Sequence, residues 1–443
     1  MARRNRILAG IQSLYSSPSP GTGFMAFSGE QVALAGSLNN AGNQWEEYLY
    51  SGGADGAGSS GVQGLRQLYR VQSADWDFTI PRQNVPQFGQ FAPIDQIILQ
   101  SPTVTLNFSY LLANFYNEAS GLGFTVSHSG TGLGTGPVDQ NRANNVAPLS
   151  AISGILTKVT DEKNYFLKIS REGIDSVGDT ETTLGNIQTV GIGNGFLSSY
   201  GVNLSVGQLP VVTVGVEALN VAVANGMTGQ SPAVTPSDGV RVSRLFRIPV
   251  ATEDPGAGVN DSNISALRPG DVVLSLTKRA AGDTTYGTLG YDVFGADVSG
   301  NVDNIVTNGR VQNCNISFNL TRDAIEKLGS KFAVSREITF PVEINATMDV
   351  IATDFISGDL SALINCDNQY DISVGVKRPA TCGSTSQPLI VNYIVKGAKL
   401  NSENSRLTID GNQTISLSFT SQVGGPNQTN IGLYLSGHCR DVG

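Results

Sequence analysis

The second half of the chain repeats the first, and this repeat constrains the fold more than any other feature of the sequence. The matching residues are Arg70, Val71, Gln72, Phe78, Arg82, Gly89 and Ile98 in the first copy, and Arg310, Val311, Gln312, Phe318, Arg322, Gly329 and Ile338 in the second. Each pair is separated by 240 positions. A repeat at a long fixed interval indicates that a structural unit is present twice.

The apolar pattern around these identities predicts a half-buried strand in each copy. Ala74, Trp76, Phe78 and Ile80 alternate with polar residues, and so do Cys314, Ile316, Phe318 and Leu320. Alternation with a period of two places every second side chain on one face of a sheet. We therefore expect Trp76, Phe78, Phe318 and Ile344 to be buried.

Further blocks match in the same order. Leu149-Ser150-Ala151-Ile152 is echoed by Leu360-Ser361-Ala362-Leu363, Tyr165 by Tyr370, and Val212, Val214 and Val216 by Ile415, Leu417 and Phe419. The block at 149–152 and its match at 360–363 predict a short helix in each copy. Their apolar residues share one helical face, and a capping residue or a proline precedes each block. Each copy thus reads as strand, strand, short helix, strand, strand.

Composition supports a mainly β protein with many turns. The chain has 443 residues, of which 15% are charged and 52 are glycine, and its net charge is −9. So few basic residues disfavour a protein that grips nucleic-acid phosphates. The sequence also lacks an apolar run long enough for a signal peptide or a membrane span.

These patterns divide the chain into four segments. Residues 1–65 form a Gly/Ser-rich N-terminal arm, 66–226 the first β domain, 227–239 a linker, and 240–443 the second β domain with an approach segment at its start. Loose composition over 17–62 and 129–145 predicts segments that become ordered only against a neighbour. The fold class is therefore mainly β, with two tandem domains and one short flanking helix in each.

No arrangement of residues predicts catalysis, a cofactor or a metal ion. The histidines are His128 and His438, in opposite copies, and the cysteines Cys314, Cys366, Cys382 and Cys439 form no CxxC pair. We expect all four thiols to be reduced. The glycine-rich runs 130–136 and 191–195 fit no phosphate-binding loop, and we interpret both as flexible turns.

Two pairs of matched residues are structural candidates. Arg82 and Arg322 each follow the first strand of their copy, where a planar guanidinium suits an inter-subunit ion pair or a fork with a carboxylate. An arginine that only caps a loop is the alternative interpretation. Gly89 and Gly329 indicate a turn that needs a positive φ.

The repeated blocks resemble a known family. Residues 311–312, 318–322, 328–331 and 340–344, with 71–72, 82, 88–90 and 200–207 in the first copy, are similar to the tail tube proteins of long-tailed bacteriophages. The blocks are short, and their order and duplication give the resemblance its specificity. The arm, the 129–145 insertion and the segment 240–300 match no family pattern.

This resemblance implies that the two tandem domains are β-sandwich-like or barrel-like tail-tube domains. It also implies a non-enzymatic virion protein, made in the host cytoplasm, whose sheets join between subunits into stacked rings that conduct DNA. Its implied partners are itself, the tail terminator, the tape-measure protein and the distal tail protein, with DNA passing unbound and no membrane contact. Single-copy members form rings of six, so a duplicated chain predicts three per ring. The alternatives are a distal tail or neck ring protein, and a capsid decoration or host-binding β-protein.

Overall fold

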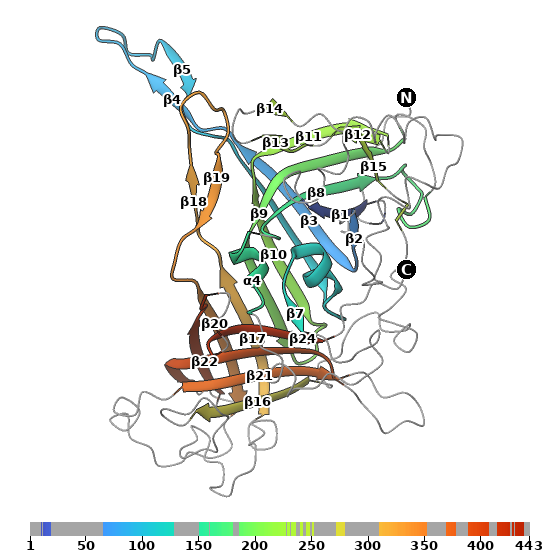
Figure 1. Cartoon of the computed structure of the whole chain (residues 1–443), viewed down its shortest axis with the longest axis vertical. Helices are drawn as coiled ribbons and strands as arrows, with labels where there is room; N and C mark the ends of the chain where they lie inside the picture. Colours follow the sequence, from blue (N-terminus) through green and yellow to red (C-terminus); the bar gives the residue numbers. More distant parts are fainter. Residues whose placement is uncertain are drawn as a thin grey trace, which may run out of the picture.

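A computed structural model shows a mainly β protein, as the sequence predicts (Figure 1). It describes residues 10, 12–18, 65–127, 150–158, 160–179, 186–226, 228–230, 232–235, 240–241, 245–248, 250–251, 272–279, 310–351, 369–377, 389–406, 414–425, 428 and 430–437. The predicted loose segment 129–145, the second-copy helix, and all but Ser17 and Pro18 of segment 17–62 lie outside these residues.

The strands fall into two sets that follow one another along the chain. The first set is β1 (Gln12–Pro18), β3 (Val71–Thr79), β4 (Arg82–Val85), β5 (Asp95–Ile98), β6 (Thr103–Leu111), β8 (Glu162–Ile169), β9 (Gln188–Ser205), β10 (Val211–Ala218) and β11 (Asn220–Asn225). The second set is β16 (Val272–Arg279), β17 (Arg310–Asn319), β18 (Arg322–Ile325), β19 (Ser335–Ile338), β20 (Glu343–Ile351), β21 (Gln369–Lys377), β22 (Leu389–Arg406), β23 (Thr414–Gln422) and β24 (Gly432–Gly437). Strands at equivalent places in the two sets make equivalent pairings.

The registers of β3–β6 and β17–β20 correspond with a constant offset of 240 residues. Phe78 lies opposite Val104, and Phe318 lies opposite Ile344. Both pairs contain a register shift at the same place, between residues 71 and 73 and between residues 311 and 313. The sequence repeat at 70–98 is therefore also a repeat of strand pairing.

The C-terminal strands correspond with an offset of 203 residues. β10 pairs with β6 and β9 as β23 pairs with β20 and β22, so that Val214 occupies the place of Leu417. The register shift beside Ser198 in β9 recurs beside Asn401 in β22. The predicted match of residues 212–216 with 415–419 therefore agrees with the register.

One predicted match is displaced by two residues. Lys163 lies opposite Gly195, and Tyr370 lies opposite Ala398, the position that corresponds to Gly195. Tyr370 therefore corresponds to Lys163, whereas the sequence paired it with Tyr165. The error arose because two tyrosines in similar apolar surroundings look equivalent until backbone pairing sets the register.

The two sets form one sheet through a direct strand contact. The sheet path runs β16–β21–β22–β23–β20–β17–β9–β10–β6–β3, in which β17 of the second set pairs with β9 of the first. One apolar cluster extends through both sets, and rings from each meet in it: those of Tyr200 and Phe318 are 5.6 Å apart, and those of Phe115 and Tyr393 are 5.0 Å apart. Closure of each set into a separate sandwich or barrel stays a prediction.

The predicted N-terminal arm and the predicted linker each contain described strands. β1 lies in the predicted arm, yet it pairs with β8 as β16 pairs with β21. In the predicted linker, β12 (Thr228–Gln230) pairs with β15 (Leu245–Arg247), β13 (Val234–Thr235) pairs with β14 (Val240–Arg241), and Val234 is buried against Leu219 and Ala333. The sequence did not predict these short strands because the segments that contain them are polar and lack a clear apolar alternation.

The glycine-rich run 191–195 is part of β9 and is not a flexible turn. A Cβ atom on Gly193 would lie 2.5 Å from the backbone of Pro232. Glycine at this position therefore lets the segment around Pro232 approach the strand closely. A close backbone approach is one of the usual reasons for glycine inside a strand. The turn interpretation was wrong because composition alone does not distinguish the two roles.

Helical structure is confined, among the described residues, to short turns in the first copy. A π-helical turn spans Asn117–Leu122, and α4 spans Ser153–Leu156, just after the predicted start at Leu149. β2 (Arg66–Leu68) and β7 (Val126–Ser127) complete the described elements, pairing with β1 and β24. Cys314 is free and buried, as expected, and the other cysteines lie outside the described residues.

Burial of the predicted stripe differs between the copies. Phe318 and Ile344 are buried as expected, whereas Trp76 is 37% and Phe78 is 50% exposed. The expectation for Trp76 and Phe78 was wrong because β3 is the last strand of the sheet path, and no described strand lies beside its outer edge.

This difference predicts unequal costs for two equivalent substitutions. Phe318→Ala should lower the free energy of unfolding by about 3–5 kcal/mol, because it leaves a cavity in a packed core. Phe78→Ala should cost about 1 kcal/mol in the isolated chain, because half of the ring is already in water. Urea unfolding of both variants measures the contrast, and equal losses would contradict the exposed placement of β3.

Candidate functional site

The contact between the two copies is the internal seam, which we define as residues 199–205 of β9 against residues 313–319 of β17. Tyr200 lies opposite Phe318, Val202 opposite Ile316, and Asn203 opposite Asn315. The first two pairs point into the core and the third lies on the other face, because side chains alternate along each strand. Main-chain pairing thus joins the two copies edge to edge.

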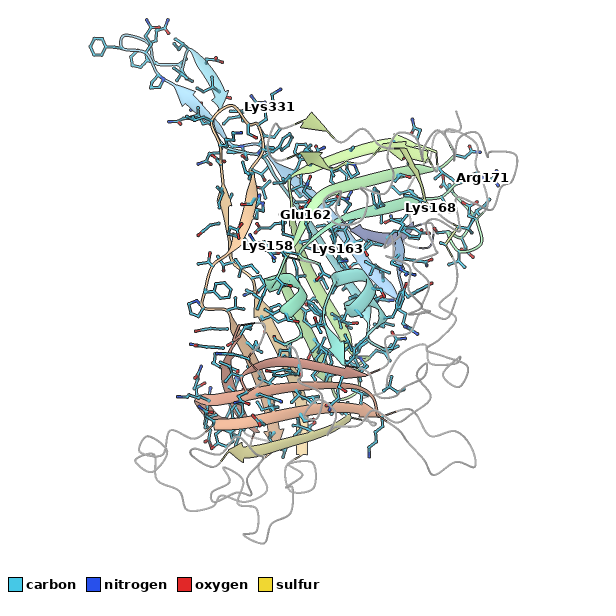
Figure 2. All side chains as sticks on the ribbon, viewed as in Figure 1. Lys158, Glu162, Lys163, Lys168, Arg171 and Lys331 are labelled. Atoms are coloured by element: carbon cyan, nitrogen blue, oxygen red, sulfur yellow. The ribbon has the colours of Figure 1, made fainter. Side chains whose placement is uncertain are left out.

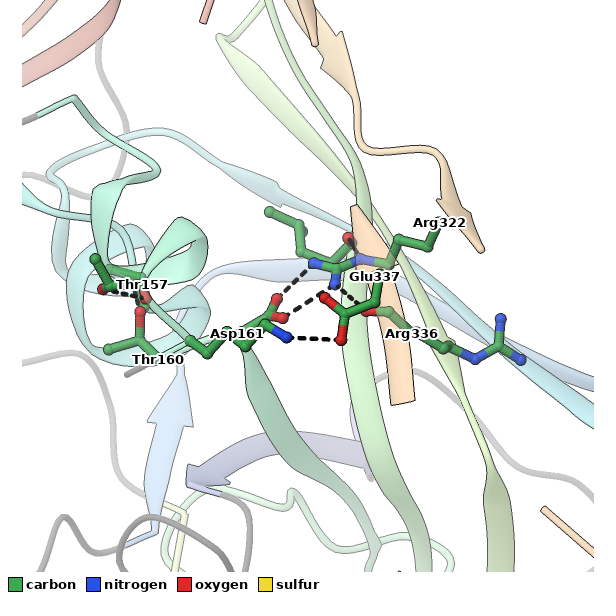
Figure 3. A network of polar contacts seen from close by, with 10 residues as sticks. Thr157, Thr160, Asp161, Arg322, Arg336 and Glu337 are labelled. Atoms are coloured by element: carbon green, nitrogen blue, oxygen red, sulfur yellow. Dashed lines mark hydrogen bonds and ion pairs between the residues drawn. The ribbon is translucent and has the colours of Figure 1, made fainter. Parts of the chain in front are cut away.

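Arg322 fastens one end of the internal seam (Figure 3). Its two terminal nitrogens donate to the two carboxylate oxygens of Asp161, and its Nε donates to the carbonyl oxygen of Leu197 at 3.0 Å. The guanidinium also lies over the ring of Phe196, 5.1 Å from its centre. The arginine is therefore the predicted carboxylate fork, and its partner belongs to the same chain.

Two further ion pairs attach the β18–β19 hairpin to the first copy. Arg336 donates to Glu217 at 2.6 Å, and Lys158 donates to Glu337 at 2.6 Å. The hydrogen bond from Lys158 lowers the pKa of Glu337, whereas burial lowers the pKa of Arg336. The hairpin that follows β17 is thus held by polar contacts on both of its strands.

Arg82 has a different environment from Arg322. It is exposed at the start of the β4–β5 hairpin, which extends from the body of the molecule beyond β18–β19 (Figures 1 and 2). Its contact with another subunit stays a prediction. Gly89 and Gly329 lie at the two hairpin tips with φ values of 89° and 86°, in the region that glycine favours.

The first copy exposes an apolar segment that we call the uncovered segment, residues 76–99. Its exposed apolar residues are Trp76, Phe78, Ile80, Phe88, Phe91, Ile94, Ile97, Ile98 and Leu99. Of the equivalent positions in the second copy, Ile316, Phe318 and Leu320 are buried. Large contiguous apolar patches on a protein surface usually mark an interaction site.

The sheet has a second notable surface, a polar face on the side opposite the core. One row of paired residues crosses from β3 to β22: Ser73, Ser109, Thr213, Gly201, Ser317, Asn345, Thr420 and Lys399. Among the side chains that the structure describes, the carboxylates on this face are Asp75, Asp77, Glu217, Glu343 and Asp349, and the basic groups are Lys399, Arg406 and Arg336, which pairs with Glu217. Carboxylates therefore outnumber basic groups on it.

A buried polar cluster lies where the copies meet in the core. The hydroxyl of Tyr110 donates to Glu118 at 2.7 Å, that of Tyr200 donates to the same oxygen at 3.1 Å, and the hydroxyls of Tyr200 and Tyr393 are 2.9 Å apart. Burial raises the pKa of Glu118 to about 7 despite these hydrogen bonds. The cluster ties β6, β9 and the π-helical turn to β22 of the second copy.

Asp161, Glu118 and the polar face were missed by the sequence analysis. Asp161 and Glu118 lie outside the matched sequence blocks, so the repeat gave no signal for them. The polar face had a signal in the Ser, Thr and Asn residues that alternate with the apolar stripe.

Other chemistry is not evident in the residues that the structure describes. They contain no cluster of three or more potential metal ligands, and none of their helices is long and apolar enough to cross a membrane. No protein-family model matches the chain, and a search of curated proteins finds no match.

The buried fork at Arg322 should be important for stability. Asp161→Ala should lower the free energy of unfolding by about 3–5 kcal/mol, because it leaves a buried guanidinium without its charge partner. Lys158→Ala is the matched control on an exposed pair and should cost less than about 1 kcal/mol. Denaturant unfolding tests both, and an Asp161→Ala loss as small as the control would refute the role.

Glu118 should make stability depend on pH. Between pH 4.5 and about 7 the unfolded chain ionises this carboxyl while the folded chain keeps its proton, so stability should fall as pH rises through that window. Glu118→Gln should reduce this decline by up to about 3 kcal/mol. Unfolding midpoints of both proteins at pH 5 and pH 8 measure the difference, and an unchanged decline would contradict it.

Proposed function

We propose that the chain is a tail tube subunit of a long-tailed bacteriophage, which assembles into stacked rings that conduct DNA. The observation that carries this proposal is the sheet path, in which two matching four-strand units stand edge to edge, β22–β23–β20–β17 and β9–β10–β6–β3. Such a row can be continued by further chains, because β3 and the second half of β22 are equivalent to β17 and to the second half of β9, which are already joined within the chain.

The open edges of β3 and of residues 402–406 of β22 favour assembly over a monomeric role. Unpaired N–H and C=O groups along a strand edge pair readily with another chain unless they are covered. A heterologous contact of this kind produces a ring when the rotation between subunits closes. Closure of a ring through these two edges would leave neither of them unpaired.

The polar face suits the inner wall of a conduit. Its Ser, Thr, Asn and Gly residues give a hydrated surface, and its carboxylates exceed its basic residues. DNA is held chiefly by lysine and arginine contacts to phosphates, so an acidic and neutral wall would let it pass. The apolar side of each strand faces the core and would form the outer part of the wall.

The duplicated architecture favours three chains per ring. Two equivalent units in one chain would occupy two of six positions, giving three-fold symmetry with a pseudo-six-fold wall. The proposed setting is the virion tail, after assembly in the host cytoplasm. The partners are further copies of the chain, the tail terminator, the tape-measure protein and the distal tail protein, with DNA passing unbound.

Ring formation is the direct test. Purified protein should form rings or tubes in negative-stain images, and native mass spectrometry should count three chains in each closed ring. A ring of six chains, with one copy lining the channel and the other outside it, would refute the three-chain arrangement. Monomers at every concentration tested would refute the assembly function itself.

A further inference from the structure

We propose that β3 of one chain pairs antiparallel with residues 402–406 of β22 in a second copy of the chain, with Asp75 opposite Arg406. This inference rests on the proposed function and deepens it, because it assigns the partner and the register of the contact. The internal seam between β17 and β9 supplies the template.

Both strands have an open edge in the described part of the chain. β3 pairs along its length with β6 alone. β22 pairs with β21 and β24 through its first half, whereas residues 402–406 pair, among the described strands, with β23 alone. The equivalent half of β9 has two partners, β10 on one side and β17 on the other.

The equivalence of the two copies determines the register between β3 and β22. β3 corresponds to β17 with an offset of 240, and the second half of β22 corresponds to that of β9 with an offset of 203. Asn315 and Asn203 are opposite one another in the internal seam. Their counterparts are Asp75 and Arg406.

The transferred register places opposite charges directly across the strands. Asp75 and Arg406 are both exposed in the single chain, and both lie on the polar face. Oppositely charged residues stabilise a cross-strand pair, and like charges destabilise it. The next pair on the same face is Asp77 with Asn404, in which the amide can donate to the carboxylate.

The apolar side of β3 is unfinished in the single chain. Trp76 and Phe78 are 37% and 50% exposed, whereas their counterparts Ile316 and Phe318 are 0% and 2% exposed within the internal seam. A strand laid along β3 would reduce the exposure of the two rings, although the transferred register places Ser405 and Glu403 beside them, where Val202 and Tyr200 lie in the internal seam. Leu328 at the β18–β19 tip is fully exposed even though its copy is joined, so the template leaves the Phe88 end of the hairpin uncovered.

The new seam is not a copy of the internal one at every position. Glu403 lies at the position equivalent to Tyr200, and Lys399 lies at the position equivalent to Phe196. The environment of Arg322 is therefore not reproduced for Arg82. The inference is confined to the paired strands and does not extend to the hairpin.

Charge exchange tests the register. Asp75→Arg and Arg406→Asp should each reduce the ring fraction at least tenfold at a fixed concentration in sedimentation velocity, and the double variant D75R/R406D should restore it. Glu343→Arg is the matched control, since it changes an exposed carboxylate on the same face away from both edges. Single variants that assemble like wild type, or a double variant without recovery, would overturn the register.

Cysteine pairing separates this inference from ring formation. Chains with Asp77→Cys, mixed with chains carrying Asn404→Cys, should form a 77–404 disulfide that peptide mass spectrometry identifies. Glu403→Cys, one residue out of register and on the other face, should give at most a tenth of that product. A 77–404 bond without rings would support the register and refute the tube. Rings without that bond would refute the register alone, and neither product would overturn both.

Discussion

Backbone pairing between β9 and β17 is the interaction on which the rest of the structure depends. It converts two copies of a strand unit into one sheet, and it places aromatic rings from both copies in one apolar cluster. The buried fork of Arg322 with Asp161 and the tyrosines around Glu118 lie beside this pairing. Neither copy has a complete interior alone, because each contributes side chains to the other's packing.

The same strand order therefore has different consequences in the two copies. In the second copy, the apolar side of β17 is covered by β9 and its surroundings. In the first copy, the equivalent β3 ends the sheet and exposes Trp76 and Phe78. β3 and β17 have the same pairing register, so the difference in exposure of their side chains comes from the neighbouring strand and not from the strand itself.

The sequence predicted the positions of the strands better than the burial and the contacts of their side chains. Period-two alternation located β3 and β17, and the repeat predicted their equivalence, because both depend on local pattern. It did not predict that Phe78 is exposed while Phe318 is buried, since that difference depends on which strand is adjacent. The role of Asp161 could not be predicted either, because its partner Arg322 is 161 positions away and no local sequence pattern connects the two residues. Gly193 was assigned to a turn because composition does not reveal that Pro232 packs against it.

Covalent linkage gives the internal seam a property that an edge contact between chains lacks. Residues 199–205 and 313–319 are brought together by folding, so their pairing does not weaken when the protein is diluted. Contacts between separate molecules obey mass action and are lost as protomer concentration falls. In an assembly built through the sheet edges, duplication would therefore make every second joint independent of concentration, and dissociation would begin at the joints between chains.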